Sequence, residues 1–165
     1  MIDWILQRRS IRQFQNKDIP EDRVTDLLKA AMAAPTANNV QDWEFLVVRS
    51  PEQRKALAEA HPYGKMCAQA PVVIVVIGDP TMKYMDQHCA AATQNILLAA
   101  ASMGLGSVWL GMKDPERISG VTRVTGIPEG RLPVVMIPIG YPAEEKAPRT
   151  QYDPNKVWRE QYGKR

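Results

Sequence analysis

The sequence predicts an α+β fold, one sheet with helices around it, and three stretches carry this prediction. Two β-branched runs, EFLVVR at residues 44–49 and VVIVVIG at residues 72–78, are bounded by turn residues, as buried strands are. Residues 86–104 are apolar nearly all round, which indicates a central helix that is buried on most sides. Such a helix needs neighbours on every face, so we expect it to pack against the sheet and the other helices.

The first half of the chain also contains three further helical patterns. Residues 2–9 predict a short helix, and residues 51–60 predict another between the two strands. Pro20 stands at a first-turn position and opens EDRVTDLLKAAMAA, a helix that Pro35 brings to an end. Its apolar residues recur at helical spacing, at Val24, Leu27, Leu28 and Ala31.

The second half predicts two more strands and one more helix. GSVWLG at residues 106–111 indicates a third strand, and LPVVMIPIGY at residues 132–141 indicates a fourth. Asp114 is a candidate N-cap for a helix over residues 115–124. Proline within the last strand favours an edge position or a bulge.

The C-terminal tail, residues 142–165, is rich in proline and charge and yet carries several large apolar side chains. A tail with such side chains is expected to pack on another surface. No internal repeat is visible, and the length of 165 residues predicts a single domain over residues 1–165. The large side chains of the tail are Tyr152, Val157, Trp158 and Tyr162.

Composition excludes several classes of function. The net charge of +3 is too small to indicate nucleic-acid binding, and it fits a small anionic ligand better. The segment MIDWILQRRS lacks the apolar run of a signal peptide, and no stretch has the roughly 20 apolar residues of a membrane span. Cys67 and Cys89 form no CxxC motif, which indicates a reducing compartment. We therefore expect a cytoplasmic protein that binds neither nucleic acid nor membranes.

Common cofactor and nucleophile motifs are absent. GLGSVWLG follows a helix and has Trp109 where a Rossmann fingerprint needs glycine, and there is no Walker loop. His61 and His88 are the only histidines, and two without a carboxylate cluster do not indicate a metal site. Spacing leaves a Cys/His nucleophile pair open. The alternative is that Cys89, in an apolar helix, is a small hydrophobic residue.

The segment QRRSIRQF at residues 7–14 is the first candidate site. It places Arg8, Arg9 and Arg12 around the hydroxyl of Ser10, and arginine forks suit bidentate contacts to phosphate. If the chain leaves the helix near Ser10, Arg8 and Arg12 converge while Arg9 points elsewhere. The alternative is a solvated cluster of surface charge.

The second candidate site is APTANNVQDWEF at residues 34–45, a polar loop between a helix and a strand. Side-chain amides donate and accept hydrogen bonds at once, which suits the edge of a heterocycle such as a pyrimidine. The alternative is ordinary turn chemistry, in which such residues satisfy their own backbone. The polar residues of the loop are Thr36, Asn38, Asn39 and Gln41.

Four segments taken together, in order and spacing, resemble the nitroreductase family of FMN flavoproteins. They are RRSIRQF, APTANNVQDWEFLVV, ATQNILLAAASMGLGSVWLG and IGYPAEEKAPR, and the resemblance covers nearly the whole chain. It implies a nitroreductase-like fold with a central, mainly antiparallel sheet. It also implies an interlocked homodimer with a C-terminal arm on the partner subunit and two FMN sites at the interface.

The resemblance assigns the first segment to FMN. Arg8, Ser10 and Arg12 match the R-x-S-x-[RK] pattern that holds the phosphate, ribityl and pyrimidine groups. Arg9 belongs to the same segment and joins the cofactor-binding candidates, although it is the member expected to be solvated.

The resemblance also assigns the polar loop, which it implies reaches the flavin from the other subunit. Thr36 replaces the usual serine and keeps the hydroxyl, and Asp42 stands where proline is common, so the loop conformation is expected to differ. The matching residues of the P-S-x-x-N loop are Pro35, Thr36, Ala37 and Asn39, and those of the following Q-x-W are Gln41 and Trp43.

Three later positions complete the implied site. Lys65 matches a lysine near the flavin pyrimidine, where a cation would stabilise the negative charge of the reduced ring. Leu110 and Gly111 match the loop that covers the ring near N5, with Leu110 in place of the glutamate of larger members. Arg149 matches a late basic residue of the phosphate site, with Lys146 as a weaker candidate.

The implied activity is that of an FMN-dependent NAD(P)H oxidoreductase with ping-pong kinetics. Hydride passes from NAD(P)H to flavin N5 and then to a small oxidised acceptor, such as a nitroaromatic or a quinone, and no side chain need act as acid or base. One alternative is a related enzyme that acts on enones or halogenated aromatics. Others are a flavin-binding or storage protein without useful turnover, and a structural protein with merely solvated arginines.

Overall fold

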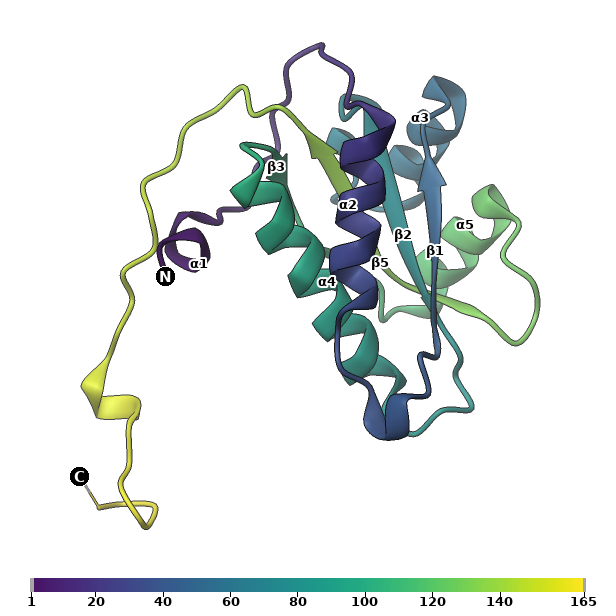
Figure 1. The fold of residues 1–165 in the computed structure, drawn as a ribbon. Helices are drawn as coiled ribbons and strands as arrows, with labels where there is room; N and C mark the ends of the chain where they lie inside the picture. Colours follow the sequence, from purple (N-terminus) through teal and green to yellow (C-terminus); the bar gives the residue numbers. More distant parts are fainter. Residues whose placement is uncertain (1, 165) are drawn as a thin grey trace.

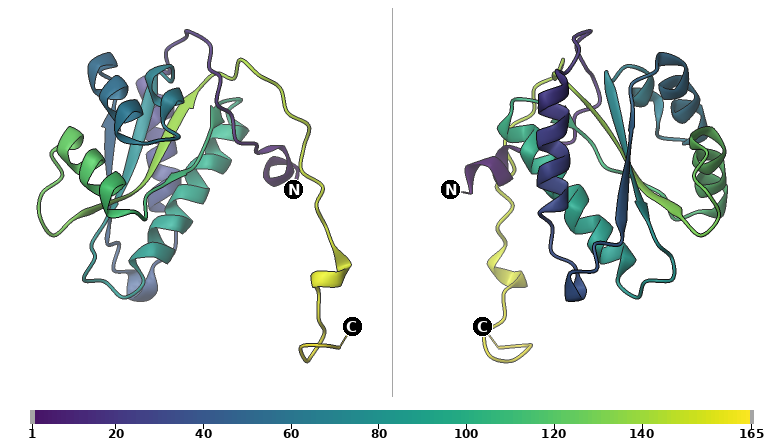
Figure 2. Two further views of the ribbon diagram at one scale, coloured as in Figure 1. Left: turned by 180° about the vertical axis from the view of Figure 1, so that it is seen from behind. Right: turned by 45° about the vertical axis from the view of Figure 1, so that its right-hand side comes forward.

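A computed structural model describes residues 2–164 and contains one five-stranded sheet with helices on both faces (Figures 1 and 2). The strands β1 (Trp43–Val48), β2 (Val72–Gly78) and β5 (Leu132–Gly140) are neighbours in that order. Two short strands, β3 (Gly106–Ser107) and β4 (Leu110–Gly111), pair with the other side of β5. Every strand pair is antiparallel, which confirms the predicted fold class. The two ends of the predicted domain, residues 1 and 165, lie outside the described residues.

Strand β2 is buried on both faces, as its uninterrupted β-branched run predicts. Successive side chains of a strand point to opposite faces. Val72, Ile74 and Val76 therefore join the apolar cluster beneath the helices α2 (Glu21–Met32) and α4 (Met85–Ser102). The alternate residues, among them Val73 and Val75, join a second cluster beneath α3 (Pro51–Ala60) and α5 (Pro115–Thr125).

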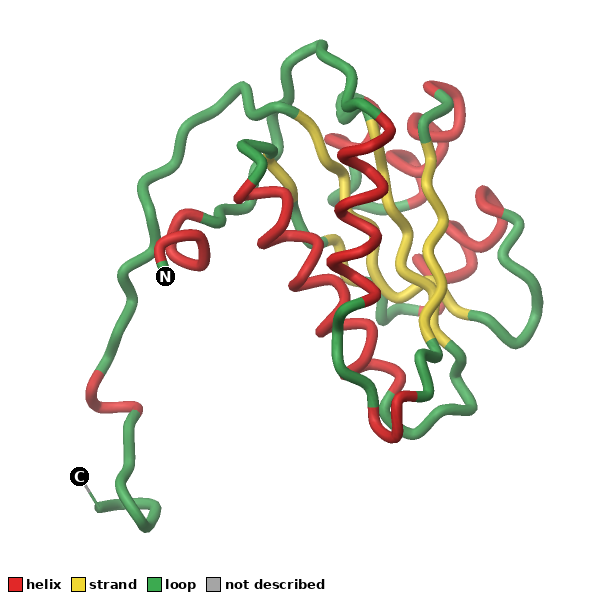
Figure 3. The backbone as a smooth tube through the Cα atoms, viewed as in Figure 1, coloured by secondary structure: helices red, strands yellow, loops and turns green. Residues whose placement is uncertain are grey.

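The helices form one layer on each side of the sheet (Figure 3). On α2, Val24, Leu27 and Ala31 are fully buried at the spacing of one helical face. On α4, buried residues occur throughout the helix from His88 to Ala100, as expected of a helix with neighbours on several sides. No helix of residues 2–164 is both long enough and apolar enough to cross a bilayer.

Pro20, expected in a first-turn position, is the residue directly before α2, and the starts of α3 and α5 are capped differently. Ser50 caps α3, and its hydroxyl accepts a hydrogen bond from the amide of Gln53 at 3.3 Å. Asp114 precedes α5 as predicted, but its side chain makes no capping hydrogen bond. It pairs with Arg117 instead, with 2.8 Å between Oδ2 and Nε.

The predicted third strand is wrong as a continuous element. Residues 106–111 form two pieces, β3 and β4, because Val108 and Trp109 do not pair with β5. The interruption lies opposite Ile137 and Pro138, since Ser107 pairs with Ile139 and Leu110 pairs with Met136. Proline has no amide hydrogen to donate, so an interrupted ladder is least costly at such a position.

For the last strand, proline left an edge position or a bulge open, and the strand is not at an edge. Strand β5 has β2 on one side and β3 and β4 on the other. The alternative expectation, a bulge, is confirmed, because the register with β2 shifts between Val76 and Ile77, next to Pro133. A bulge accommodates a residue that cannot complete the ladder.

The two ends of the chain run side by side before the tail leaves the body (Figure 2). The Arg149 amide donates to the Leu6 carbonyl at 2.8 Å, next to the short helix α1 (Asp3–Gln7). Beyond this contact, Tyr152 is 78% exposed and Tyr162 is 89% exposed. The tail includes one short turn of helix, η3 (Pro154–Lys156). Its packing on another surface stays a prediction.

Candidate functional site

Residues 8–12 lie beside strand β3 and are held there by backbone contacts. Ser10 bridges Ser107, and the Ile11 amide donates to the Ser107 carbonyl at 2.9 Å. Lys146, from the segment after β5, donates to the Ser10 carbonyl at 2.6 Å. A Cβ at Gly106 would lie 2.7 Å from Ile11, so glycine allows this close approach. The segment therefore presents its side chains from a fixed backbone.

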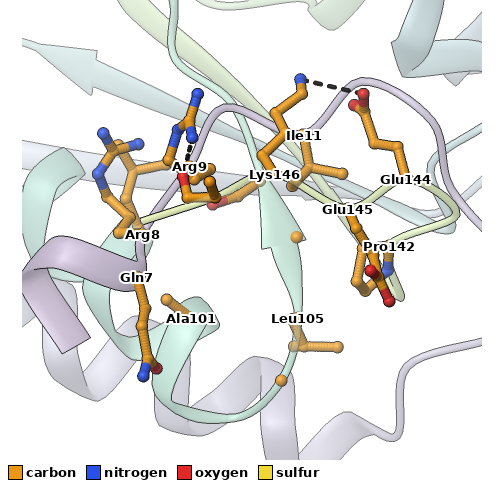
Figure 4. A pocket seen from close by; sticks show the side chains of 15 residues that line it. Gln7, Arg8, Arg9, Ile11, Ala101, Leu105, Pro142, Glu144, Glu145 and Lys146 are labelled. Atoms are coloured by element: carbon orange, nitrogen blue, oxygen red, sulfur yellow. Dashed lines mark hydrogen bonds and ion pairs between the residues drawn. The ribbon is translucent and has the colours of Figure 1, made fainter. Parts of the chain in front are cut away.

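Arg8 and Arg9 lie on one side of a cavity of about 480 Å³, which we call the Arg8 cavity (Figure 4). Pro142, Glu144 and Glu145 lie on the other side. The lining residues are Gln7, Arg8, Arg9, Ile11, Leu97, Ala101, Gly104, Leu105, Gly106, Ser107, Pro142, Glu144, Glu145, Lys146 and Ala147.

Positive charge is concentrated at the arginine side of this cavity. Burial lowers the pKa of Arg8, and the charges of Arg149 and Arg9 lower it further. An arginine still keeps its proton at neutral pH, so the three cations repel one another. A bound anion would relieve that repulsion, and the arginine fork suits a phosphate group.

Arg9 differs from the sequence expectation, which had it pointing into solvent. One terminal nitrogen donates to the Ala147 carbonyl. Its Nε is buried and has no hydrogen-bond partner within the described residues. A buried, unpaired donor is costly, which suits a position that a ligand completes.

The acidic side of the Arg8 cavity is already occupied by local contacts. Glu144 accepts hydrogen bonds from the Arg12 amide at 2.5 Å and the Gln13 amide at 3.3 Å. It also pairs with Lys146 at 3.0 Å. The pKa of Glu144 is lowered, first by the Arg12 amide and also by Lys146. Its charge is therefore committed to the backbone and Lys146, not to the three arginines.

A second cavity of about 560 Å³, the Trp109 cavity, brings together four other residues named by the sequence. They are Arg12, Lys65 on the short helix η2 (Lys65–Ala68), and Leu110 and Gly111 on β4. The expected convergence of Arg8 and Arg12 is wrong, because the two side chains line different cavities. The wall of the Trp109 cavity consists of Arg12, His61, Pro62, Tyr63, Lys65, Met66, Trp109, Leu110, Gly111 and Arg117.

His61 fixes the position of Gly111 in this cavity. The ring is 3% exposed, and its Nδ1 accepts the Tyr63 amide hydrogen at 3.2 Å. Nε2 therefore carries the ring hydrogen of the neutral form and donates to the Gly111 carbonyl at 3.2 Å. Sequence reasoning left His61 without a role. His61 could have been identified by the rule that a buried polar side chain needs hydrogen-bond partners.

The polar loop lies away from both cavities, beside the N-terminal half of α4 (Figure 1). It contains the short helix η1 (Ala37–Asn39), and Asn38, Asn39 and Gln41 have φ angles of 53°, 55° and 51°. The Thr36 hydroxyl accepts the Gln41 amide hydrogen at 3.1 Å. Within one chain, the loop and residues 8–12 therefore do not form one site.

A buried pair of side chains, His88 and Asp42, holds this loop through hydrogen bonds. Nε2 of His88 accepts the Ala37 amide hydrogen at 2.9 Å, so Nδ1 carries the ring hydrogen and donates to Asp42 at 2.6 Å. The side chains are 7% and 4% exposed. Asp42, which departs from the pattern of the resemblance, thus anchors the loop through His88. The departure at Asp42 is visible in the sequence, but nothing in the sequence identifies His88 as its partner.

The remaining chemistries from the sequence are not supported. Burial raises the pKa of Cys67 to about 12 and that of Cys89 to about 12, so both are thiols at neutral pH. Cys89 lies in the core, as the alternative reading expected. Within residues 2–164, no group of three or more potential ligands is arranged to hold a metal ion.

The whole chain, and not only its site, can be compared with known proteins. The Nitroreductase family model matches residues 5–61 and 59–141. The chain belongs to the nitroreductase family. This confirms the resemblance drawn from the four sequence segments.

Relatives of the same size share the whole fold. A protein of Methanothermobacter thermautotrophicus, provisionally named NADH dehydrogenase/NAD(P)H nitroreductase, is 41% identical over 98% of this chain and 87% of its own length. A crystal structure of a protein with the same provisional name from Bacteroides thetaiotaomicron is 41% identical, with a TM-score of 0.94 over 98% of this chain and 97% of that one. A protein from Desulfovibrio desulfuricans, provisionally named a nitroreductase and solved in complex with FMN, is 30% identical, with a TM-score of 0.83 over 98% and 96% of the two chains.

Proposed function

We propose that this nitroreductase-family protein is an FMN-dependent oxidoreductase that passes hydride from NAD(P)H to small oxidised acceptors such as nitroaromatics or quinones. The observation that carries the proposal is the group of Arg8, Arg9 and Arg149: the first two line one cavity, and the charge of Arg149 acts on Arg8. Residues 8–12 connect that cavity to a second one with a partly apolar wall. The named activities and the FMN complex of its relatives support the same reading.

The residues present fit FMN at both of its ends. The Arg8 cavity offers arginine donors for a phosphate, including the buried and unpaired Nε of Arg9. Ser10 stands in the sequence between Arg8, which lines one cavity, and Arg12, which lines the other, so its hydroxyl would meet the ribityl group. The Trp109 cavity would take the ring, with Arg12 and Lys65 at its polar edge.

Bound FMN supplies reversible two-electron chemistry, accepting hydride from NAD(P)H and passing it to an acceptor in a ping-pong cycle. The chain itself supplies binding and electrostatics. Lys65 and Arg12 would place positive charge where a bound ring gains negative charge on reduction, which would favour reduction. His61 holds the Gly111 carbonyl, and so would fix the backbone that lines the ring site. Because NAD(P)H is a cytoplasmic metabolite, we place the activity in the cytoplasm.

The polar loop takes part only if the protein is a homodimer, because it lies away from both cavities of its own chain. We propose that Pro35, Thr36, Ala37, Asn39 and Gln41 reach the FMN of the partner subunit. Exposed apolar side chains at both ends of the chain give the partner a surface to cover. They include Trp4 and Ile5 on α1 and Tyr152 and Tyr162 in the tail. Size-exclusion chromatography with light scattering is expected to give twice the monomer mass, and a single monomer mass at micromolar concentration rejects the dimer.

The activity is tested with the purified protein and its visible spectrum. We expect a yellow protein whose flavin absorbance bleaches with NADH or NADPH under nitrogen and returns when a nitroaromatic or quinone is added. A colourless protein that takes up no added FMN overturns the proposal. Bound FMN that no nicotinamide reduces at a catalytic rate would instead indicate a flavin-binding or storage protein.

A further inference from the structure

The Trp109 cavity carries more positive charge than the proposed binding of FMN requires. Its wall includes three cationic side chains, Arg12, Lys65 and Arg117, and its lining residues include no carboxylate. Arg12 and Lys65 are assigned to the polar edge of the flavin ring. Arg117 comes from a different element, α5, and has no role in that assignment.

Arg117 is held in a defined orientation by two neighbours. Its Nε pairs with Asp114 Oδ2 at 2.8 Å, and its guanidinium carbon lies 5.5 Å from the centre of the Tyr63 ring. A guanidinium is planar and has five N–H donors, so these contacts leave donors on the two terminal nitrogens. Neither terminal nitrogen has a hydrogen-bond partner within the described part of the chain. Asp114 is more exposed than Arg117, and such a surface pair contributes little binding energy of its own.

Aromatic surfaces adjoin this guanidinium. Tyr63 is 66% exposed and Trp109 is 38% exposed, and both rings line the same cavity as Arg117. Aromatic side chains of this kind bind flat apolar ligands through their faces. A flat ring with an oxyanion attached directly to it would contact both kinds of group at once.

We propose that Arg117 selects aromatic acceptors that carry a carboxylate or another oxyanion on the ring, an inference that rests on the proposed function. The phosphates of NAD(P)H are a second source of oxyanions. In NAD(P)H, a ribose separates the phosphates from the nicotinamide ring. Arg117, in contrast, lies directly beside Tyr63, so an oxyanion that contacts Arg117 would be close to a ring that packs on Tyr63. A substituent on the ring of the acceptor fits that short separation better. Arg117 is then the residue that makes an anionic nitroaromatic a better substrate than its neutral isostere.

The test compares 4-nitrobenzoate with the neutral 4-nitrobenzamide in the FMN-loaded protein. For each acceptor, kcat/KM of the variant is divided by that of the wild type, so the intrinsic reactivities of the two compounds cancel. Arg117→Gln should lower this ratio for the benzoate about tenfold more than for the benzamide, mostly through KM, because a charge-assisted hydrogen bond is lost. Arg117→Lys, which keeps the charge, should recover part of the difference.

Lys113 provides a matched control. It lies just before α5, is exposed, and lines neighbouring cavities but not the Trp109 cavity. Lys113→Gln removes the same amount of charge and should leave the discrimination between benzoate and benzamide as in the wild type. Equal discrimination losses in Lys113→Gln and Arg117→Gln would mean that the general charge of the surface is responsible, which overturns the proposal.

Two further outcomes also overturn it. If Arg117→Gln lowers both acceptors equally, the side chain is structural. If it raises KM for NADPH and leaves the benzoate ratio unchanged, the oxyanion belongs to the donor. Failure of the proposed function looks different, because the wild-type protein with bound FMN would then reduce neither acceptor. Normal reduction of the benzamide without any discrimination by charge defeats only the role of Arg117.

Discussion

Residues 8–12 and the loop of residues 35–42 are proposed to bind the same cofactor, yet the structure holds them in different ways. The first segment is fixed by backbone contacts to β3 and by Lys146, and its arginines already line cavities within the same chain. The loop is fixed by a buried His88 and Asp42 pair, and it lines neither cavity.

If both segments bind FMN as proposed, one chain contains two separate half-sites. One half has excess positive charge that an anion would neutralise. The other half has polar groups on a backbone with three left-handed residues, a conformation that costs energy unless the surroundings fix it. A second copy of the chain is the simplest way to bring the two halves together, because one chain keeps them apart.

The largest expected effect comes from the support of the loop. His88→Leu leaves the carboxylate of Asp42 buried without its partner, which should lower the free energy of unfolding by about 3 kcal/mol. Thermal unfolding measures this change. Gln87→Leu, at the exposed neighbouring position, should change stability by less than about 0.5 kcal/mol. If the double variant His88→Leu, Asp42→Leu is as unstable as the sum of both single variants, the two residues do not act as a pair.

The next effect concerns the arginine half-site. Arg8→Ala should raise the Kd for FMN about 30-fold, which corresponds to about 2 kcal/mol for a charge-assisted contact. Fluorescence titration of the FMN-free protein measures it. Stability without FMN should not fall, because the substitution removes repulsion from Arg9 and Arg149. Arg123→Ala, an exposed arginine on α5, is the control, and an equal effect there would mean that Arg8 acts only through net charge.

A smaller effect is expected within the loop. Thr36→Ala removes the acceptor of the Gln41 amide and should destabilise the protein by about 1 kcal/mol. Thr36→Ser keeps the hydroxyl and should cost clearly less. Chemical denaturation compares the two variants. If both lose the same stability, the methyl group of Thr36 matters and the hydrogen bond does not.

The smallest effect is the response of the buried thiols to pH. Their folded pKa is about 12 for Cys67 and about 12 for Cys89, raised by burial, whereas an unfolded thiol ionises near pH 8.5. Their contribution is therefore complete at pH 7, well below the unfolded pKa, and is lost as the pH rises through 8.5 toward 12. About 0.4 kcal/mol per thiol is lost between pH 7 and 8.5. Iodoacetamide at pH 8.5 should label neither cysteine until the protein is unfolded, and rapid labelling of the folded protein would contradict this burial.

The sequence predicted the layers of the fold because they depend on local patterns. The run VVIVVIG is β-branched at almost every position, and a strand buried on both faces follows from it. The same logic failed at residues 106–111, because the interruption between β3 and β4 lies opposite Pro138, on a strand distant in the sequence. For β5, proline left an edge position or a bulge open, and only the fold shows that the strand is interior with a register shift beside Pro133.

The candidate site was predictable in its members but not in its geometry. Family motifs identify Arg8, Arg12 and Lys65, yet only the fold shows that Arg8 and Arg12 line different cavities. The roles of His61 and His88 depend on hydrogen bonds to residues about 50 positions away in the chain. No local pattern reports such contacts.

Mixed dimers test the central claim of two half-sites from different subunits most directly. One chain carries Arg8→Ala, the other carries Thr36→Ala and Asn39→Ala, and the two are co-expressed with different tags and purified as the heterodimer. If the loop serves the partner's cavity, one site contains all the substitutions and the other contains none. The heterodimer should then bind one FMN with wild-type affinity, whereas each variant homodimer binds weakly. A heterodimer without any tight FMN site would show that the loop acts within its own chain, and a Thr36→Ala, Asn39→Ala homodimer that binds FMN with wild-type affinity would show that the loop does not act at all; either result would contradict the account.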